Sequence, residues 1–110
     1  MAYDDGMAEQ MRADIGEVPG LSEKKMFGGL CFLLNGNMVC GVHAGGAMFR
    51  PGKPREAEAL DLPGVAPLSF TGRPMGGMVE VDETGFADDK TRLALVGLSL
   101  ANAASLPAKG

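Results

Sequence analysis

The sequence predicts a two-layer α+β domain in which helices cover one face of an antiparallel sheet. An Asn-Gly step at residues 35–36, between two apolar runs, marks a β-hairpin because both residues tolerate a positive φ. The other short strand-like segments are joined by tight turns, which implies antiparallel pairing, and helical patterns do not alternate with them as in βαβ units. The expected order is helix, three or four strands, helix, two strands, helix.

Length, composition and charge indicate which classes of protein this chain can belong to. With 110 residues, 45% of them hydrophobic and 22% charged, the chain is predicted to form a single globular domain over residues 1–110. The formal net charge of −4 argues against direct binding of nucleic acid, which Lys and Arg drive. No apolar run approaches the ~20 residues of a membrane span, and the acidic start lacks the pattern of a signal peptide. We therefore expect a cytoplasmic protein without membrane contact.

The first helix is predicted over residues 4–16, and the first strand over residues 22–27. Asp4 and Asp5 are favourable at a helix start, where the cap position and the macrodipole both favour acidic side chains. An apolar stripe at i, i+4 and i+8 is expected to face the core: Met7, Met11 and Ile15.

The hairpin that follows has a preferred register. A three-residue loop over residues 35–37 places six apolar side chains on one face of the sheet, and a shift of one residue would undo this arrangement. The expected facing pairs are Leu34 with Met38, Phe32 with Cys40, and Leu30 with Val42. These residue types suit a half-buried pleated surface.

The middle of the chain is predicted to add a short strand and a short helix. The strand covers residues 47–50. Pro54 suits the first position of a helix, so a two-turn helix is expected over residues 54–60, with Ala57 and Leu60 buried.

Two further strands are predicted over residues 66–70 and 77–82, joined by a loop with the sequence TGRPMGG. The second of them has the alternation of a strand with one buried and one solvated face. Val79 and Val81 are assigned to the buried face, and Met78, Glu80 and Asp82 to the solvated one.

The last helix is predicted over residues 88–105, opened by Asp88 and Asp89. Its expected apolar stripe consists of Leu93, Val96, Leu100 and Ala104, with Leu95 and Leu98 offset from it. This surface is wider than a helix on a small sheet needs. We therefore expect the chain to associate into a homodimer.

Five segments together resemble the TfoX N-terminal domain family. They are KKMFGG at 24–29, FLLNGNMVCGV at 32–42, MFR at 48–50, FTGRPMGGMVEVD at 70–82 and SLPAK at 105–109. The resemblance implies a two-layer α+β fold of the secretion-chaperone-like type. The family's namesakes, the TfoX/Sxy proteins, regulate DNA-uptake competence with a cyclic-AMP receptor protein at promoters and carry a second, C-terminal domain. We expect no second domain within these 110 residues. The family brings no catalytic residues and no cofactor, so the resemblance implies a non-enzymatic regulatory domain that acts through protein partners.

Basic residues gather in the first half of the chain. Between Lys24 and Arg55 there are five Lys or Arg residues and no Asp or Glu. A basic sheet edge could bind an acidic partner, whereas the alternative is that the acidic helices neutralise these charges within the fold or across a dimer. The candidate interaction residues are Lys24, Lys25, Arg50 and Arg73.

Cys31 and Cys40 are the only cysteines. In a cytosolic chain they are expected to be reduced and buried, as small hydrophobes. A two-residue turn at residues 35–36 would instead pair Leu34 with Asn37 and set the two cysteines directly opposite one another, as a thiol-redox pair requires. A thiol-redox or small-ligand sensor is therefore the alternative function.

His43 lies three residues after Cys40, but the sequence offers no convincing fourth zinc ligand. No serine or cysteine nucleophile signature accompanies it, so we interpret it as an exposed or capping residue. No catalytic, metal or cofactor residues are assigned. An enzyme of unrecognised type would need Lys25, His43, Arg50 or Arg73 to converge in one deep pocket.

Overall fold

The structure is a computed structural model that describes residues 3–26, 28–69 and 74–107. The helices are α1 (Asp5–Ile15), the 3-10 helix η1 (Lys53–Arg55), α2 (Glu56–Leu60), α3 (Glu83–Ala87) and α4 (Asp89–Ser105). The strands are β1 (Leu21–Met26), β2 (Gly29–Leu34), β3 (Asn37–His43), β4 (Gly46–Phe49), β5 (Val65–Ser69) and β6 (Pro74–Val81). They form one sheet in the order β1-β2-β3-β4-β6-β5, with every neighbouring pair antiparallel. The predicted fold class is confirmed.

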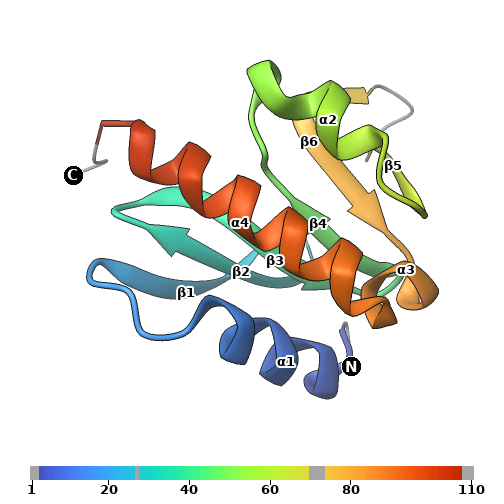
Figure 1. The fold of residues 1–110 in the computed structure, drawn as a ribbon. Coiled ribbons are helices and arrows are strands. Elements are labelled where there is room, and N and C mark those ends of the chain that lie inside the picture. The colour runs from blue at the N-terminus through green and yellow to red at the C-terminus, as the bar shows by residue number, and fades with distance from the viewer. Residues whose placement is uncertain (1–2, 27, 70–73, 108–110) are drawn as a thin grey trace.

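The helices form a layer on one face of the sheet, with α4 running across it between α1 and α2 (Figure 1). All four α-helices contribute buried residues to a single core cluster with the sheet. This helix-covered cluster contains Phe32, Val39, Cys40, Val42, Phe49, Val79 and Val81 from the strands, and Met11, Ala59, Phe86, Leu95 and Val96 from the helices.

A smaller set of buried residues lies apart from this core. This second cluster consists of Cys31, Met38, Met48, Leu68 and Met78, with Leu33 packed against it. Residues of the two clusters alternate along β4 and β6, for example Met48 and Phe49, so the clusters occupy opposite faces of the sheet. None of the described helices contributes a residue to the second cluster.

The helix α1 begins and ends close to the predicted limits. Its N-cap is Asp4, whose carboxylate accepts hydrogen bonds from the N–H groups of Gly6 and Met7. Arg12 on its outer side donates to both carboxylate oxygens of Glu23, at 2.7 and 2.9 Å, and so ties α1 to β1. This hydrogen bonding lowers the pKa of Glu23.

The hairpin combines features of both expected registers. Its turn has two residues, Asn35 with φ 52° and Gly36 with φ 84°, so the predicted three-residue loop is wrong. The pairs next to the turn are Leu34 with Asn37 and Leu33 with Met38, which makes the expected pairing of Leu34 with Met38 wrong as well.

A bulge then restores the preferred pairing further along the hairpin. Val39 is the extra residue on β3, and beyond it Phe32 faces Cys40 and Leu30 faces Val42, as predicted. Because the bulge lets consecutive residues face one side, both Val39 and Cys40 enter the helix-covered cluster. Met38 turns to the opposite face.

The short elements differ from prediction in what they bury. The helix predicted over residues 54–60 begins as the 3-10 turn η1, and α2 buries Ala59, whereas Ala57 is exposed and Leu60 half-buried. Val79 and Val81 are buried as predicted. Met78, assigned to a solvated face, is buried in the second cluster instead.

The end of the chain holds two corrections. The helix α3 was not predicted, although its N-cap, Asp82, accepts a hydrogen bond from the N–H of Gly85. In α4, the expected stripe is out of phase with the buried face, because Leu93 and Ala104 are exposed. The residues that α4 buries are Thr91, Arg92, Leu95, Val96, Ser99 and Ala103.

Candidate functional site

The predicted basic residues do not form one patch in the part of the chain that the structure describes. Lys24 and Lys25 are both exposed on the edge strand β1, but they pair with Cys31 and Leu30, which belong to opposite faces of the sheet. Arg50 is partly buried after β4, three strands away. Arg73 lies outside the described residues.

The two cysteines also lie on opposite faces of the sheet. Cys31 faces Gly41 across the hairpin and belongs to the second cluster, whereas Cys40 faces Phe32 in the helix-covered cluster. Both are free thiols. Burial raises the pKa of the Cys31 thiol to about 11, and it raises the pKa of Cys40 further. The direct opposition that a redox pair requires is absent, although the two-residue turn expected to produce it is present.

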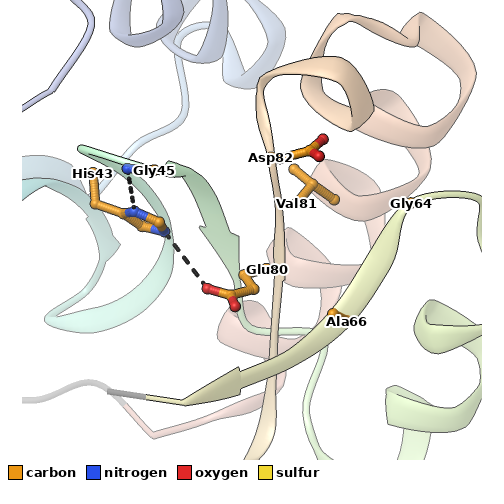
Figure 2. A pocket seen from close by; sticks show the side chains of 7 residues that line it. All are labelled: His43, Gly45, Gly64, Ala66, Glu80, Val81 and Asp82. Carbon is orange, nitrogen blue, oxygen red and sulfur yellow. Dashed lines mark hydrogen bonds and ion pairs between the residues drawn. The ribbon is translucent and has the colours of Figure 1, made fainter. Parts of the chain in front are cut away.

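A concave site at the end of β3 brings together residues far apart in the sequence (Figure 2). It is a cavity of about 320 Å³. Its lining residues are His43, Gly45, Gly64, Ala66, Glu80, Val81 and Asp82. His43 and Glu80 point toward one another across it, with 4.0 Å between Nε2 of the imidazole and Oε2 of the carboxylate.

The hydrogen bond between His43 and the β3–β4 turn determines which nitrogen of the imidazole carries the proton. Nδ1 accepts a hydrogen bond from the N–H of Gly45 at 3.2 Å, so in the neutral ring the proton resides on Nε2. Nε2 is buried and has no hydrogen-bond partner among the residues that the structure describes. His43 therefore caps the turn, as the sequence suggested, but its side chain is only 16% exposed.

This geometry suits binding better than metal ligation or catalysis. A metal at Nε2 would need the lone pair there, which forces a proton onto Nδ1 against the N–H of Gly45. Within residues 3–26, 28–69 and 74–107, no group of three metal-ligating side chains occurs. The cavity offers an imidazole N–H donor beside the Glu80 carboxylate, and none of the described residues that line it is a serine or cysteine.

A second concave region lies in the helix layer, between α4 and the segment η1–α2. Two adjoining hollows of about 220 and 320 Å³ share Arg55, Leu98 and Ala101. We call this region the α4 groove. Its remaining lining residues are Pro51, Pro54, Glu58, Leu62, Leu93, Ala94, Gly97, Asn102 and Ser105.

The opposite side of α4 is fixed by a buried ion pair. Arg92 donates through Nε to the carboxylate of Asp14 on α1, and each side chain is only 7% exposed. Arg92 also pairs with Asp89 at 2.8 Å and donates to the carbonyl oxygen of Phe86 at 3.0 Å. Desolvation lowers the pKa of Arg92, but hydrogen bonds to Asp14 and Asp89 outweigh it, so the net direction is upward. The groove is therefore formed by a helix whose orientation is fixed.

Sequence reasoning found neither concave region. His43 was recognised without Glu80, because the two come together only through the pairing of β4 with β6, and three other elements lie between these strands in the chain. Lys25, His43 and Arg50 do not converge, since no cavity described above is lined by more than one of them. The signal for the α4 groove was Gly97, an isolated glycine in a helical pattern, which often marks a packing requirement.

Comparison with known proteins places the chain in a family. The model of the TfoX N-terminal domain matches residues 13–103. No curated protein and no solved structure gives a significant match. Among the described residues, no helix has the length and apolar character needed to cross a membrane. The chain belongs to the TfoX N-terminal domain family.

Proposed function

We propose that this TfoX N-terminal domain is a non-enzymatic regulatory module that acts in the cytoplasm through a protein partner. Its role is of the same kind as the role of the family's namesakes in competence. The observation that carries the proposal is the family match over residues 13–103. A regulatory protein that contacts transcription machinery needs an accessible surface rather than reactive groups. The β1 edge of the sheet, with its exposed lysines, is the surface we assign to the partner.

The surface chemistry supports a protein partner rather than nucleic acid. Lys24 and Lys25 stand beside Glu23, which Arg12 already engages, so the edge carries a mixture of charges. A duplex phosphate backbone is bound by a continuous basic surface, whereas the net charge of this chain is −4. An acidic protein segment can pair with two exposed lysines at a strand edge without such a surface.

The test is capture of partners from the native cell lysate by the purified domain. Three variants reverse the candidate charges: the double variant Lys24→Glu, Lys25→Glu and the single variants Arg50→Glu and Arg73→Glu. The matched control is Lys53→Glu, a substitution at an exposed position of η1. We expect a transcription regulator or polymerase subunit to bind to the native domain and the control, and to be lost with the double variant. Equal recovery by the double variant would contradict the assigned surface, and recovery of no such protein would contradict the function.

A small-ligand sensor is the second candidate, and the cavity of His43 and Glu80 is the observation that favours it. The unpartnered Nε2–H donor and the adjacent carboxylate, 4.0 Å apart, match a ligand that both accepts and donates, such as a carboxamide. Native mass spectrometry of the protein from its own cells tests this. A bound small molecule that is lost from both His43→Ala and Glu80→Gln variants supports the sensor, and an unliganded native mass contradicts it.

A further inference from the structure

The outward face of α4 is mostly apolar between its first and last turns. Leu93 is 51% exposed and is an exposed large hydrophobic residue on a helix whose other leucines are buried or half-buried. The exposed or half-buried positions recur at the spacing of one helix face, and after the first turn none of them is charged. The positions on this face are Lys90, Leu93, Ala94, Gly97, Leu98, Ala101, Ala104 and Ser105, and beside it Asp89, Leu100 and Asn102 are also exposed or half-buried.

Gly97 lies at the middle of this face and leaves room for close approach. A Cβ at this position would meet no atom within 4 Å. Neighbouring Ala94 and Ala101 are also small, and all three line the α4 groove. A second helix can therefore approach the backbone of α4 at Gly97 more closely than at any leucine.

The charges at the two ends of α4 complement each other. The last turn of α4 contains no basic residue, although its carbonyl groups favour one. Lys90 is exposed in the first turn, beside the exposed Asp89, whose carboxylate is paired with Arg92. Gly97 stands seven residues from both Lys90 and Ala104, two helical turns in each direction along one face. An antiparallel copy of α4 that crosses at Gly97 thus brings each Lys90 to the other copy's last turn.

The same crossing matches large side chains with small ones. Leu93 lies four residues before Gly97, and Ala101 lies four residues after it. In the antiparallel arrangement the exposed Leu93 of one copy meets Ala101 of the other, on both sides of the axis. The wall of the groove also carries both signs of charge, Arg55 and Glu58, 3.7 Å apart, so it does not repel a copy of itself.

We propose that the α4 groove is occupied by a second copy of this chain, with the two α4 helices antiparallel across a two-fold axis at Gly97. The interface is isologous, which is the commonest arrangement of soluble homodimers. Leu93 and Leu98 supply its apolar centre, and Lys90 supplies charge to the partner's helix end. This inference stands independently of the proposed function, since it requires neither a regulatory role nor the β1 edge.

The first experiment measures mass by light scattering over a range of protein concentrations. Gly97→Leu adds a side chain at the axis, where a Cβ would meet no other atom within 4 Å, whereas Ala13→Leu adds the same side chain at an exposed position of α1. We expect a dimer for the native chain and for Ala13→Leu, and at least about a tenfold weaker association for Gly97→Leu. Helical circular dichroism confirms that each variant is folded. A monomeric native chain, or a Gly97→Leu variant that associates normally, overturns the proposal.

The second experiment locates the axis directly. In the Gly97→Cys variant, the two introduced thiols face one another across the two-fold axis, and the native Cys31 and Cys40 are buried and do not compete. Mild oxidation is expected to yield a covalent dimer, while the Ala13→Cys control stays monomeric in denaturing electrophoresis. Absence of cross-linking in Gly97→Cys, or equal cross-linking in both variants, places the axis elsewhere and overturns the arrangement.

Discussion

Both faces of the sheet carry buried side chains, but these are packed by different means. On the helix-covered face, aromatic and branched side chains such as Phe32, Phe49 and Val79 pack against four helices. On the opposite face, the second cluster contains three methionines, one cysteine and Leu68, and none of the described helices reaches it. Adjacent residues on β4 show the contrast, because Met48 and Phe49 are both fully buried, on opposite faces.

The difference shows how one sheet uses two kinds of packing. Phenylalanine and valine have few rotamers and need a surface of matching shape, which the helix layer provides. Methionine is flexible and fills irregular spaces. On the second face Cε of Met48 and Sγ of Cys31 converge on the position where Gly41 has no side chain. Substitutions that change the shape of a side chain should therefore destabilise the helix-covered face. Substitutions that add volume should destabilise the second face.

The largest effect is expected where the helix layer itself is fixed. Arg92→Ala removes the partner of Asp14 and leaves a carboxylate that is 7% exposed between α1 and α4. Breaking a buried ion pair from one side costs about 3–5 kcal/mol, because the remaining charge is uncompensated. Urea unfolding followed by circular dichroism measures the loss.

The control removes both charges of this pair. In the Arg92→Met, Asp14→Leu double variant no buried charge is left, so we expect a smaller loss of stability than in Arg92→Ala. Should the single variant lose less than about 1 kcal/mol, within the range of surface pairs, the helix layer would not depend on this ion pair.

The next prediction compares the two faces at neighbouring positions. Phe49→Ala opens a cavity beneath the helices and is expected to cost about 3–5 kcal/mol, whereas Met48→Leu keeps the volume on the second face and is expected to cost less than about 1.5 kcal/mol. Both side chains are fully buried, so the expected difference comes from the cavity left by Phe49→Ala and the volume kept by Met48→Leu, and not from exposure. Equal losses in urea unfolding would show that the second face is packed as rigidly as the first.

The predictable part of the fold depended on local signals. The Asn35-Gly36 turn, the cap at Asp4 and the alternation of Val79 and Val81 are each specified by residues close in sequence. The bulge at Val39 was not predictable, because each simple register satisfied only part of the hairpin.

The concave regions depended on contacts between distant segments. The buried face of α4 includes Arg92, which is acceptable there only because Asp14, 78 residues earlier, is its partner. A stripe chosen by hydrophobicity alone therefore started from Leu93 and was out of phase with the buried face. In the same way, the cavity of His43 needs Glu80, which β4 and β6 bring to it. Position in the fold, rather than residue type, determines these sites.

Glycine-to-alanine changes give a third prediction, with opposite signs at two positions. At Gly41 a Cβ would lie 2.8 Å from the carbonyl oxygen of Leu30 and 3.0 Å from Cε of Met48. We expect Gly41→Ala to destabilise the protein by about 1–3 kcal/mol. Gly97→Ala places a Cβ in open space within a helix and should stabilise the folded monomer by about 0.5–1 kcal/mol. Thermal unfolding at low protein concentration distinguishes the two, and a Gly41→Ala variant as stable as the native chain would show that the second face can move aside.

The last prediction concerns the two thiols, one on each face. Burial raises the pKa of Cys31 to about 11, so at pH 8 only about 0.1% of it is thiolate, and Cys40 is raised further. We therefore expect slow labelling by a thiol reagent in the native protein, with Cys31 reacting before Cys40. Peptide mass mapping after timed labelling measures the order.

The same pKa shifts fix the direction of the alkaline stability change. A raised thiol pKa means that the folded chain holds a proton that the unfolded chain releases near pH 9. The contribution of Cys31 to the free energy of unfolding is therefore complete below pH 9 and declines as the pH rises toward 11. The expected loss from Cys31 is about 1 kcal/mol by pH 10. Cys31→Ala removes that contribution and should flatten the dependence of unfolding free energy on pH, whatever its own effect at pH 7. An unchanged slope in Cys31→Ala would mean that this thiol meets water readily in the folded state, and the second face would then be open at Gly41 rather than packed.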